Sequence, residues 1–180
     1  MMAGGAIGGG ITSAIARAAG SGDLMFAKKI AFNSVLIGTV MSLIYTITLG
    51  VFSVHIFNLL SDSRDVINDA VKYAKVAFGG AILTWVFFVF SSILRGLGDT
   101  YTPAKAIIIA SFIQIILSGL FTLGLVDIVN LGVTGPATAM IISHTLAAFF
   151  LLPKIIGSNS LLKCQDFALD WKAIYQILKV

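Results

Sequence analysis

Gln114 and Ser118 are the polar pair that stands out most clearly inside an apolar stretch of this sequence. They lie four residues apart, so they share one face of a helix. A glutamine at membrane depth must face protein or water, because an unsatisfied polar group is costly in hydrocarbon. An interhelical hydrogen bond would satisfy it. The functional alternative is a ligand for a substrate or a coupling ion.

A second set of polar and aromatic side chains also falls within long apolar stretches. Asn33 and Tyr45 lie in the uncharged run 30–61, and Trp85 with the phenylalanines after it makes the run 76–94 aromatic. Aromatic faces attract organic cations, so one interpretation is a site for flat cationic compounds. Packing between helices, or contact with lipid, is the other interpretation.

The remaining reactive side chains form no catalytic or metal-binding pattern. His55 and His144 have no cysteine or carboxylate at ligand spacing, and Cys164 is the only cysteine. No nucleophile and base stand together in a motif. We therefore expect no enzyme, no cofactor and no metal site. A hydrogen-bonded structural role suits both histidines better than a proton relay.

The sharpest local pattern is Arg95-Gly96-Leu97-Gly98-Asp99-Thr100, followed by Pro103. Two glycines favour the end of one helix, Asp99 and Thr100 can turn or cap the chain, and Pro103 suits the start of the next helix. This spacing predicts a structural corner between two helices.

Composition decides the environment of these side chains. Of the 180 residues, 58% are hydrophobic and only 11% are charged, against about 25% charged in an average soluble domain. The sequence therefore predicts an all-α fold, a polytopic transmembrane helix bundle in the lipid bilayer. The 12 basic residues are scattered, so the net charge of +4 indicates no nucleic-acid partner. Cutting the sequence at its charges gives about five spans, 1–19, 30–61, 76–94, 106–126 and 137–153.

Basic residues are unequally divided between the two sides of such a bundle. Alternating the loops puts nine on one side and three, Arg64, Lys72 and Lys75, on the other. Cytoplasmic loops carry the excess in membrane proteins, so we predict an integral protein of the cell (plasma or inner) membrane with a cytoplasmic C-terminus. The nine are Arg17, Lys28, Lys29, Arg95, Lys105, Lys154, Lys163, Lys172 and Lys179.

The tail 161–180 has an amphipathic pattern. Asp170 is placed to cap a helix that starts at Trp171. Phe167, Trp171, Ile174 and Leu178 are spaced to share one helix face. We predict an amphipathic helix lying on the cytoplasmic side of the membrane, or the lead-in to a further span.

Three segments together resemble the multidrug and toxin extrusion (MATE) family of secondary transporters. They are the glycine-rich 4–23, the run Arg95–Thr100 with Pro103, and Leu131–Ala139 followed by Ile142-Ser143. In the first, glycines four residues apart also let helix backbones approach closely. The resemblance extends over essentially the whole chain and adds Tyr73 to the candidate cavity residues Gln114, Ser118, Asn33 and Tyr45.

The resemblance implies twelve helices in two lobes, with a cavity between them, and export of cationic or amphipathic compounds in exchange for protons or sodium ions. Residues 1–153 correspond to helices two to six of the N-terminal lobe. Residues 154–180 correspond to the linker toward a missing second lobe. We therefore expect a fragment that does not transport alone, since alternating access needs two halves.

Two departures from the family pattern matter. Gln114 and Ser118 stand where part of the family has an Asn and an Asp used in ion coupling, so we expect coupling acids elsewhere. Ile82 stands where many members have a proline, which removes the reason to expect a kink there.

The alternatives to an antiporter are a flippase for lipids or lipid-linked sugars and a non-transporting assembly subunit. Flippases of that kind would line their cavity with several basic residues.

Overall fold

The computed structural model describes residues 2–124, 131–156 and 169–179. Within these ranges the chain is helical and contains no strand. The elements are α1 (Met2–Gly20), α2 (Leu24–Leu60), α3 (Arg64–Gly79), α4 (Ala81–Gly96), α5 (Tyr101–Leu123), a short 3-10 helix η1 (Gly132–Thr134), α6 (Gly135–Ile156) and α7 (Trp171–Leu178).

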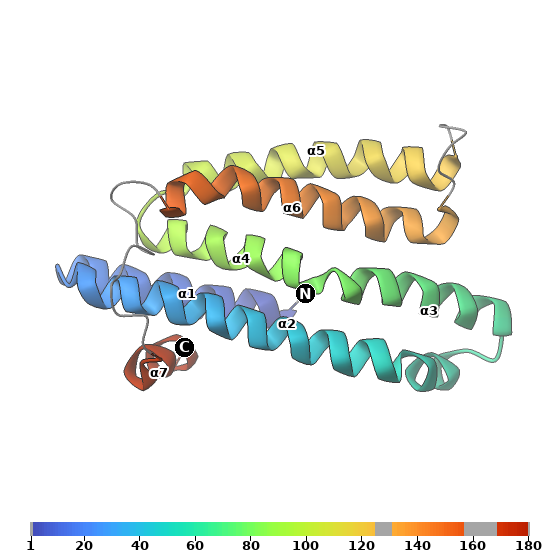
Figure 1. Cartoon of the computed structure of the whole chain (residues 1–180), viewed down its shortest axis with the longest axis horizontal. Coiled ribbons are helices and arrows are strands. Elements are labelled where there is room, and N and C mark those ends of the chain that lie inside the picture. The colour runs from blue at the N-terminus through green and yellow to red at the C-terminus, as the bar shows by residue number, and fades with distance from the viewer. Residues whose placement is uncertain (1, 125–130, 157–168, 180) are drawn as a thin grey trace.

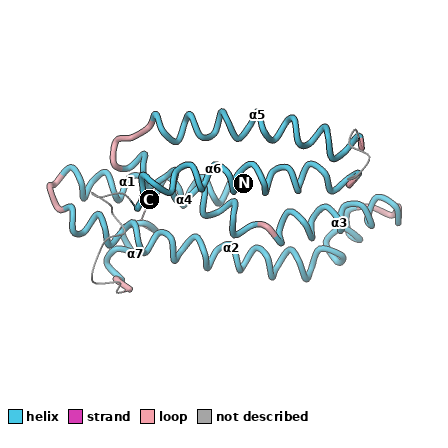
Figure 2. Tube along the Cα trace, turned by 45° about the horizontal axis from the view of Figure 1, so that its top comes forward, coloured by secondary structure: helices cyan, strands magenta, loops and turns pink. Residues whose placement is uncertain are grey.

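The long helices lie side by side along the long axis of the molecule (Figure 1). α3 and α4 follow one another along this axis, and α5 and α6 form a hairpin against α4 (Figures 1 and 2). The chain therefore runs back and forth between two ends. One end carries the α1–α2 and α4–α5 turns and α7, while the other carries the α2–α3 turn (Figure 1).

Three helical segments are long and apolar enough to cross a membrane: Leu24–Leu60, Tyr101–Leu123 and Gly132–Ile156. The bent pair α3–α4 makes a fourth if it is counted as one span. The predicted all-helical membrane bundle is confirmed at this level. The count of five stays a prediction, because α1 is helical but is not among these segments.

Small residues hold the helices close together. A side chain added at Gly96 of α4 would lie 2.8 Å from Ile15 Cβ and 2.9 Å from the Thr12 carbonyl oxygen, both on α1. Such close approach of backbones is the usual way in which membrane helices pack, since lipid tails give no hydrophobic driving force between helices. The centre of the core is filled by Ile15, Ile30, Phe87, Ile93 and Leu151.

The third predicted span, 76–94, differs most from the structure. The chain bends by 49° between α3 and α4, at Gly80. The chain is bent here even though Ile82, and not a proline, stands two residues after Gly80. Gly80 packs directly on the Ile141 side chain of α6, so a larger residue at this position would require Ile141 to move.

The bend also leaves backbone groups without regular helical partners, and α2 satisfies one of them. Thr46 Oγ1 of α2 donates a 2.7 Å hydrogen bond to the Phe78 carbonyl oxygen. A break inside an apolar helix pair is tolerated when a neighbouring Ser or Thr takes up the freed carbonyl. The bend is thus fixed from two sides, by α2 and by α6.

Gly79 and Gly80 provide a matched test of this packing. A methyl group at Gly79 meets nothing within 4 Å, whereas one at Gly80 would overlap Ile141. We expect Gly80→Ala to lower the free energy of unfolding by about 1–3 kcal/mol, the usual cost of overpacking. Thermal unfolding of the purified protein in detergent measures this.

Gly79→Ala should leave the midpoint close to that of the parent, and Gly80→Ala should cost little when it is made in an Ile141→Ala background. If Gly79→Ala and Gly80→Ala lower the unfolding midpoint equally, the contact of Gly80 with α6 does not determine the loss of stability.

Candidate functional site

A cavity of about 870 Å³ lies beside the bend between α3 and α4. Its walls come from α1, α2, α3, α4 and α6, so it draws together segments far apart in the sequence. The lining residues are Gly5, Gly8, Gly9, Thr12, Ser13, Ala16, Tyr45, Tyr73, Ala77, Phe78, Ala81, Thr84, Trp85, Phe88, Ser92, Arg95 and Met140.

Aromatic rings form part of the wall. The Tyr45 and Trp85 ring centroids are 5.9 Å apart, in a tilted arrangement. Phe88 lies one helical turn after Trp85. Its ring centroid is 5.8 Å from that of the His144 ring. Rings fixed in this way present flat apolar faces to a ligand at little cost in conformational entropy.

Polar groups on the wall are few and most are occupied. Thr12 Oγ1 donates to the Ser92 carbonyl oxygen at 3.1 Å, and Ser92 Oγ donates to the Phe88 carbonyl oxygen at 2.8 Å. Thr84 Oγ1 is buried and has no hydrogen-bond partner among the described residues. A buried hydroxyl of this kind is costly unless a ligand or water pairs with it. Thr84 lines the cavity, and rotation of its side chain about χ1 would bring the buried hydroxyl to a polar group of a ligand.

One charged residue, Arg95, stands among the described lining residues. Its guanidinium donates to the Ser91 carbonyl oxygen at 3.2 Å and to Ser92 Oγ at 3.4 Å, but the side chain remains exposed. No carboxylate is present in this described lining. Arg95 thus acts both as the end of α4 and as the charged rim of the cavity.

The structure brings two of the five predicted cavity residues together. Tyr45 and Tyr73 line the cavity from α2 and α3. Gln114 and Ser118 lie half-buried on α5, which contributes nothing to the cavity lining. Their role as ligands stays a prediction.

Asn33 is fully buried near the other end of α2, away from the cavity. Its Nδ2 donates to the Lys29 carbonyl oxygen at 2.8 Å, and its Oδ1 accepts the Asp170 backbone N–H at 3.3 Å. The side chain thus joins α2 to the start of α7.

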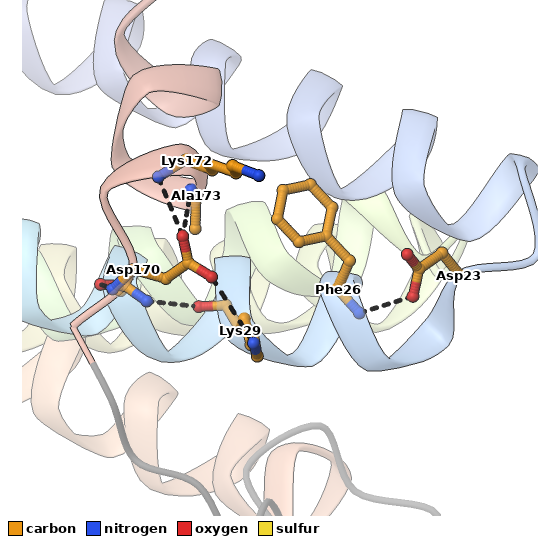
Figure 3. Close-up of polar contacts among 7 residues, drawn as sticks. Asp23, Phe26, Lys29, Asp170, Lys172 and Ala173 are labelled. Carbon is orange, nitrogen blue, oxygen red and sulfur yellow. Dashed lines mark hydrogen bonds and ion pairs between the residues drawn. The ribbon is translucent and has the colours of Figure 1, made fainter.

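Asp170 completes this junction, which Figure 3 shows in detail. Its Oδ1 accepts the backbone N–H groups of Lys172 and Ala173, and its Oδ2 lies 3.6 Å from Lys29 Nζ. Burial raises the pKa of this carboxyl, but the two N–H donors and Lys29 outweigh it and the net pKa is lowered. The predicted capping role of Asp170 is seen in the structure.

Sequence reasoning did not single out Thr84 or Thr12. Threonine is common in membrane helices, and its usual bond to a carbonyl of its own helix gives no signal in the sequence. The absence of that bond at Thr84 is visible only in three dimensions.

The predicted structural corner is present between α4 and α5. Gly98 has φ +90°, in the region that favours glycine. Asp99 accepts hydrogen bonds from the Thr102 backbone N–H at 3.0 Å and from Thr102 Oγ1 at 2.7 Å. Asp99 Oδ2 also lies 3.7 Å from Lys154 Nζ, near the end of α6. Pro103 is buried in the first turn of α5.

Thr100 differs from the expectation, since its side chain makes no capping bond although it occupies the N-cap position. The side chain of Asp99, one residue earlier, makes the capping bond to the Thr102 backbone N–H. The Thr102 N–H, the Thr102 hydroxyl and Lys154 all favour the charged carboxylate, so the pKa of Asp99 lies below its ordinary value of 3.8 despite some desolvation.

A bundle of apolar helices with a cavity beside a broken helix is the architecture of secondary transporters. The sequence profile of the MatE family matches residues 1–120. The chain belongs to the MatE family.

Curated relatives agree with this assignment. The chain is 29% identical over 178 residues to "Probable multidrug resistance protein NorM" of Thermotoga maritima, covering 95% of this chain and 37% of the relative. It is 27% identical over 146 residues to "Probable multidrug resistance protein YoeA" of Bacillus subtilis, covering 81% and 31%. It is also 27% identical over 167 residues to the "FAD transporter" of Shewanella oneidensis, covering 91% and 36%. The chain thus spans about a third of the length of these relatives.

Solved structures show the same fold. An inward-facing multidrug resistance MATE family transporter of the MOP superfamily matches with a TM-score of 0.90 and 26% identity, covering 98% of this chain and 40% of that one. A MOP superfamily transporter from Pyrococcus furiosus, described as having a binding pocket of reverse polarity, matches with a TM-score of 0.89, 26% identity and coverage of 98% and 39%.

The lowered pKa of Asp99 makes its contribution dependent on pH. A carboxylate whose pKa is depressed by folding stabilises fully above its unfolded pKa, and that stabilisation is lost as the pH falls through the folded pKa. We expect Asp99→Asn to unfold at a lower temperature than the parent at pH 7. The difference should shrink below pH 3.8.

Asp69→Asn is the matched control, because Asp69 pairs with Lys72 on an exposed surface and such pairs contribute little. If Asp99→Asn lowers the unfolding temperature by the same amount below pH 3.8 as at pH 7, the charge of Asp99 does not stabilise the α4–α5 corner.

Proposed function

We propose that this chain forms part of one lobe of a secondary antiporter. The complete protein would export drugs or other cationic or amphipathic organic compounds in exchange for protons or sodium ions. The observation that carries the proposal is the cavity at the α3–α4 bend, with aromatic faces and an unpaired Thr84 hydroxyl. A cleft that is mostly apolar, with a few placed polar groups, is typical of small-molecule sites.

Each part of the wall would have a distinct role. Tyr45, Trp85 and Phe88 would stack on or enclose a flat apolar ligand. Thr84 Oγ1 would donate to or accept from one polar group of that ligand. The described lining supplies no carboxylate to carry a proton or hold a sodium ion, so we place the coupling acids on other parts of the complete protein. Gln114 and Ser118 remain candidates for a second polar contact on α5.

The matched part covers only 31% and 37% of the length of two relatives, which supports a second lobe as the partner of this one. Alternating access then requires both, so we expect no transport by these 180 residues alone. The basic end of the bundle would face the cytoplasm, with the C-terminal end of this chain on that side. The cavity has a single basic residue, Arg95, which supports an efflux pump over a flippase for anionic lipids.

A second candidate substrate class is an aromatic compound with an acidic group. Arg95 at the cavity rim would bind such a group, and one relative is named as an FAD transporter. The two classes differ in how they respond to removal of the Arg95 charge.

Efflux by the complete transporter tests the proposal, with cells that lack other efflux pumps and a fluorescent aromatic cation as the probe. We expect Trp85→Ala to weaken the interaction by about 1–2 kcal/mol, or roughly 5- to 30-fold in the half-maximal concentration. Thr84→Val should weaken transport without changing the amount of protein in the membrane. Arg95→Gln should leave cation efflux intact, but reduce export of an acidic aromatic probe if that class is the substrate.

Phe112→Ala is the control, because Phe112 is an exposed aromatic on α5 that lies outside the cavity. Efflux that is lost equally in the Phe112 and Trp85 variants would mean that the cavity has no special role. If efflux of both probe classes is unchanged in every cavity variant, the hypothesis of a non-transporting assembly subunit would be favoured.

A further inference from the structure

The short helix α7 lies across the end of the bundle. Figure 1 shows it nearly end-on while α1 and α2 run horizontally above it, and Figure 3 shows it crossing α2. A helix in this position lies in the plane of a membrane whose normal follows the long helices. It also lies at the bundle end that carries the α1–α2 and α4–α5 turns.

One face of α7 is fastened to the bundle. Ala173 and Ile177 are buried, and Gly10 of α1 lies so close to the Ile177 carbonyl that no side chain fits there. Arg17 of α1 donates to the backbone and side-chain oxygens of Gln176 at 3.3 and 3.2 Å. Together with the Asn33 and Asp170 contacts, these bonds fix the rotation of α7 about its own axis.

This orientation leaves two residues of the predicted amphipathic face exposed, and the place of that face at the membrane stays a prediction. The pair Ala173 and Ile177 packs on the protein, whereas Trp171 and Leu178 of the predicted face point away. Ile174 is half-buried, and Phe167 lies outside the described residues.

The outward face is apolar and aromatic. Trp171, Tyr175 and Leu178 are 75%, 61% and 58% exposed, at offsets of 0, 4 and 7 that place them on one face. Tryptophan and tyrosine of this kind are enriched where membrane meets water. Lys179 Nζ lies 5.8 Å from the Tyr175 ring centroid, so a cation flanks the aromatic face.

A basic hollow lies between α7 and α1. Ser13, Arg17, Gln176 and Lys179 line about 590 Å³ of space, and both of its charges are positive. Lys172 lies in the first turn of α7 and Lys28 lies near the start of α2, where Lys29 pairs with Asp170, so both lysines add positive charge at this end. Each basic residue near an anionic leaflet attracts it, and acidic phospholipids supply the complementary phosphate.

We propose that α7 is an interfacial anchor that binds an anionic phospholipid. Trp171, Tyr175 and Leu178 enter the boundary between headgroups and acyl chains, and Arg17 and Lys179 hold the lipid phosphate in the hollow. The anchor needs only insertion of the bundle into a membrane, so it stands or fails separately from transport. Through Asn33 and Asp170 the lipid contact would also hold the start of α2 at a fixed depth.

Site-directed spin labelling of the complete protein in vesicles tests this proposal. Single cysteines would replace Trp171, Tyr175, Leu178 or Lys172 after every native cysteine, Cys164 included, is changed to serine. Labels at the first three positions should be accessible to oxygen and protected from a water-soluble nickel complex. The label at Lys172 should show the reverse. Phe112 on α5 and Lys72 on α3 are the exposed reference positions for lipid and water.

Lipid composition provides the second measurement. Replacing half of the phosphatidylcholine by phosphatidylglycerol should move the label at Leu178 deeper. Arg17→Gln with Lys179→Gln should abolish most of this shift at the same phosphatidylglycerol fraction. Arg17→Lys with Lys179→Arg keeps both charges and should keep the shift. Inorganic phosphate added to phosphatidylcholine vesicles should not reproduce it.

Two results would overturn the anchor. Labels at 171, 175 and 178 that are protected from both reagents would show that protein, such as another lobe or a second copy, covers this face. Nickel access equal to that at Lys72 would show that the face lies in water. If the depth of the label at Leu178 does not change with phosphatidylglycerol, or changes also with free phosphate, the lipid-phosphate site would be overturned.

Discussion

The need to satisfy every backbone group inside a hydrocarbon layer governs this fold. At the bend, the Phe78 carbonyl oxygen accepts the Thr46 hydroxyl of α2 as well as the Gly80 backbone N–H, and a carbonyl bonded in this way is tolerated in an apolar setting. The same bend turns α3 relative to α4 and thereby separates the walls of the cavity. One hydrogen bond between helices and one glycine–isoleucine contact therefore link the backbone geometry at the bend to the aromatic cavity beside it.

Most of the polar groups described here join helices to one another through hydrogen bonds and ion pairs. Asp99 joins the α4–α5 corner to α6, and Asp170 joins α7 to α2. Both carboxylates accept backbone N–H groups and pair with a lysine, so both are held in the charged form outside the apolar centre. Thr84 and Ser91 are the exceptions among the described residues, because their buried hydroxyls have no hydrogen-bond partner, and of the two only Thr84 lines the cavity. This contrast is what separates a structural polar group from a candidate ligand contact.

Local patterns were predictable from the sequence and contacts between distant segments were not. Asp170 could be identified as a cap because capping involves only the next few residues, and the Gly98–Asp99 corner for the same reason. The bend at Gly80 could not, because it depends on Ile141 and Thr46, which lie far away along the chain. Asn33 shows the same limit. It has the polarity expected of a cavity residue, but its partner is the backbone of Asp170, 137 residues further on.

The length of α2 has a consequence for the kind of membrane this protein suits. Its 37 residues extend about 55 Å at 1.5 Å per residue, well beyond a hydrocarbon core of about 30 Å. Exposed Val51, Phe52, Leu59 and Leu60 keep its far end apolar. A rod with this excess length experiences hydrophobic mismatch, and mismatch costs less in a thick bilayer than in a thin one. Tilting of α2 is the other way to accommodate the excess length, so the tilt of this lobe is expected to depend on bilayer thickness.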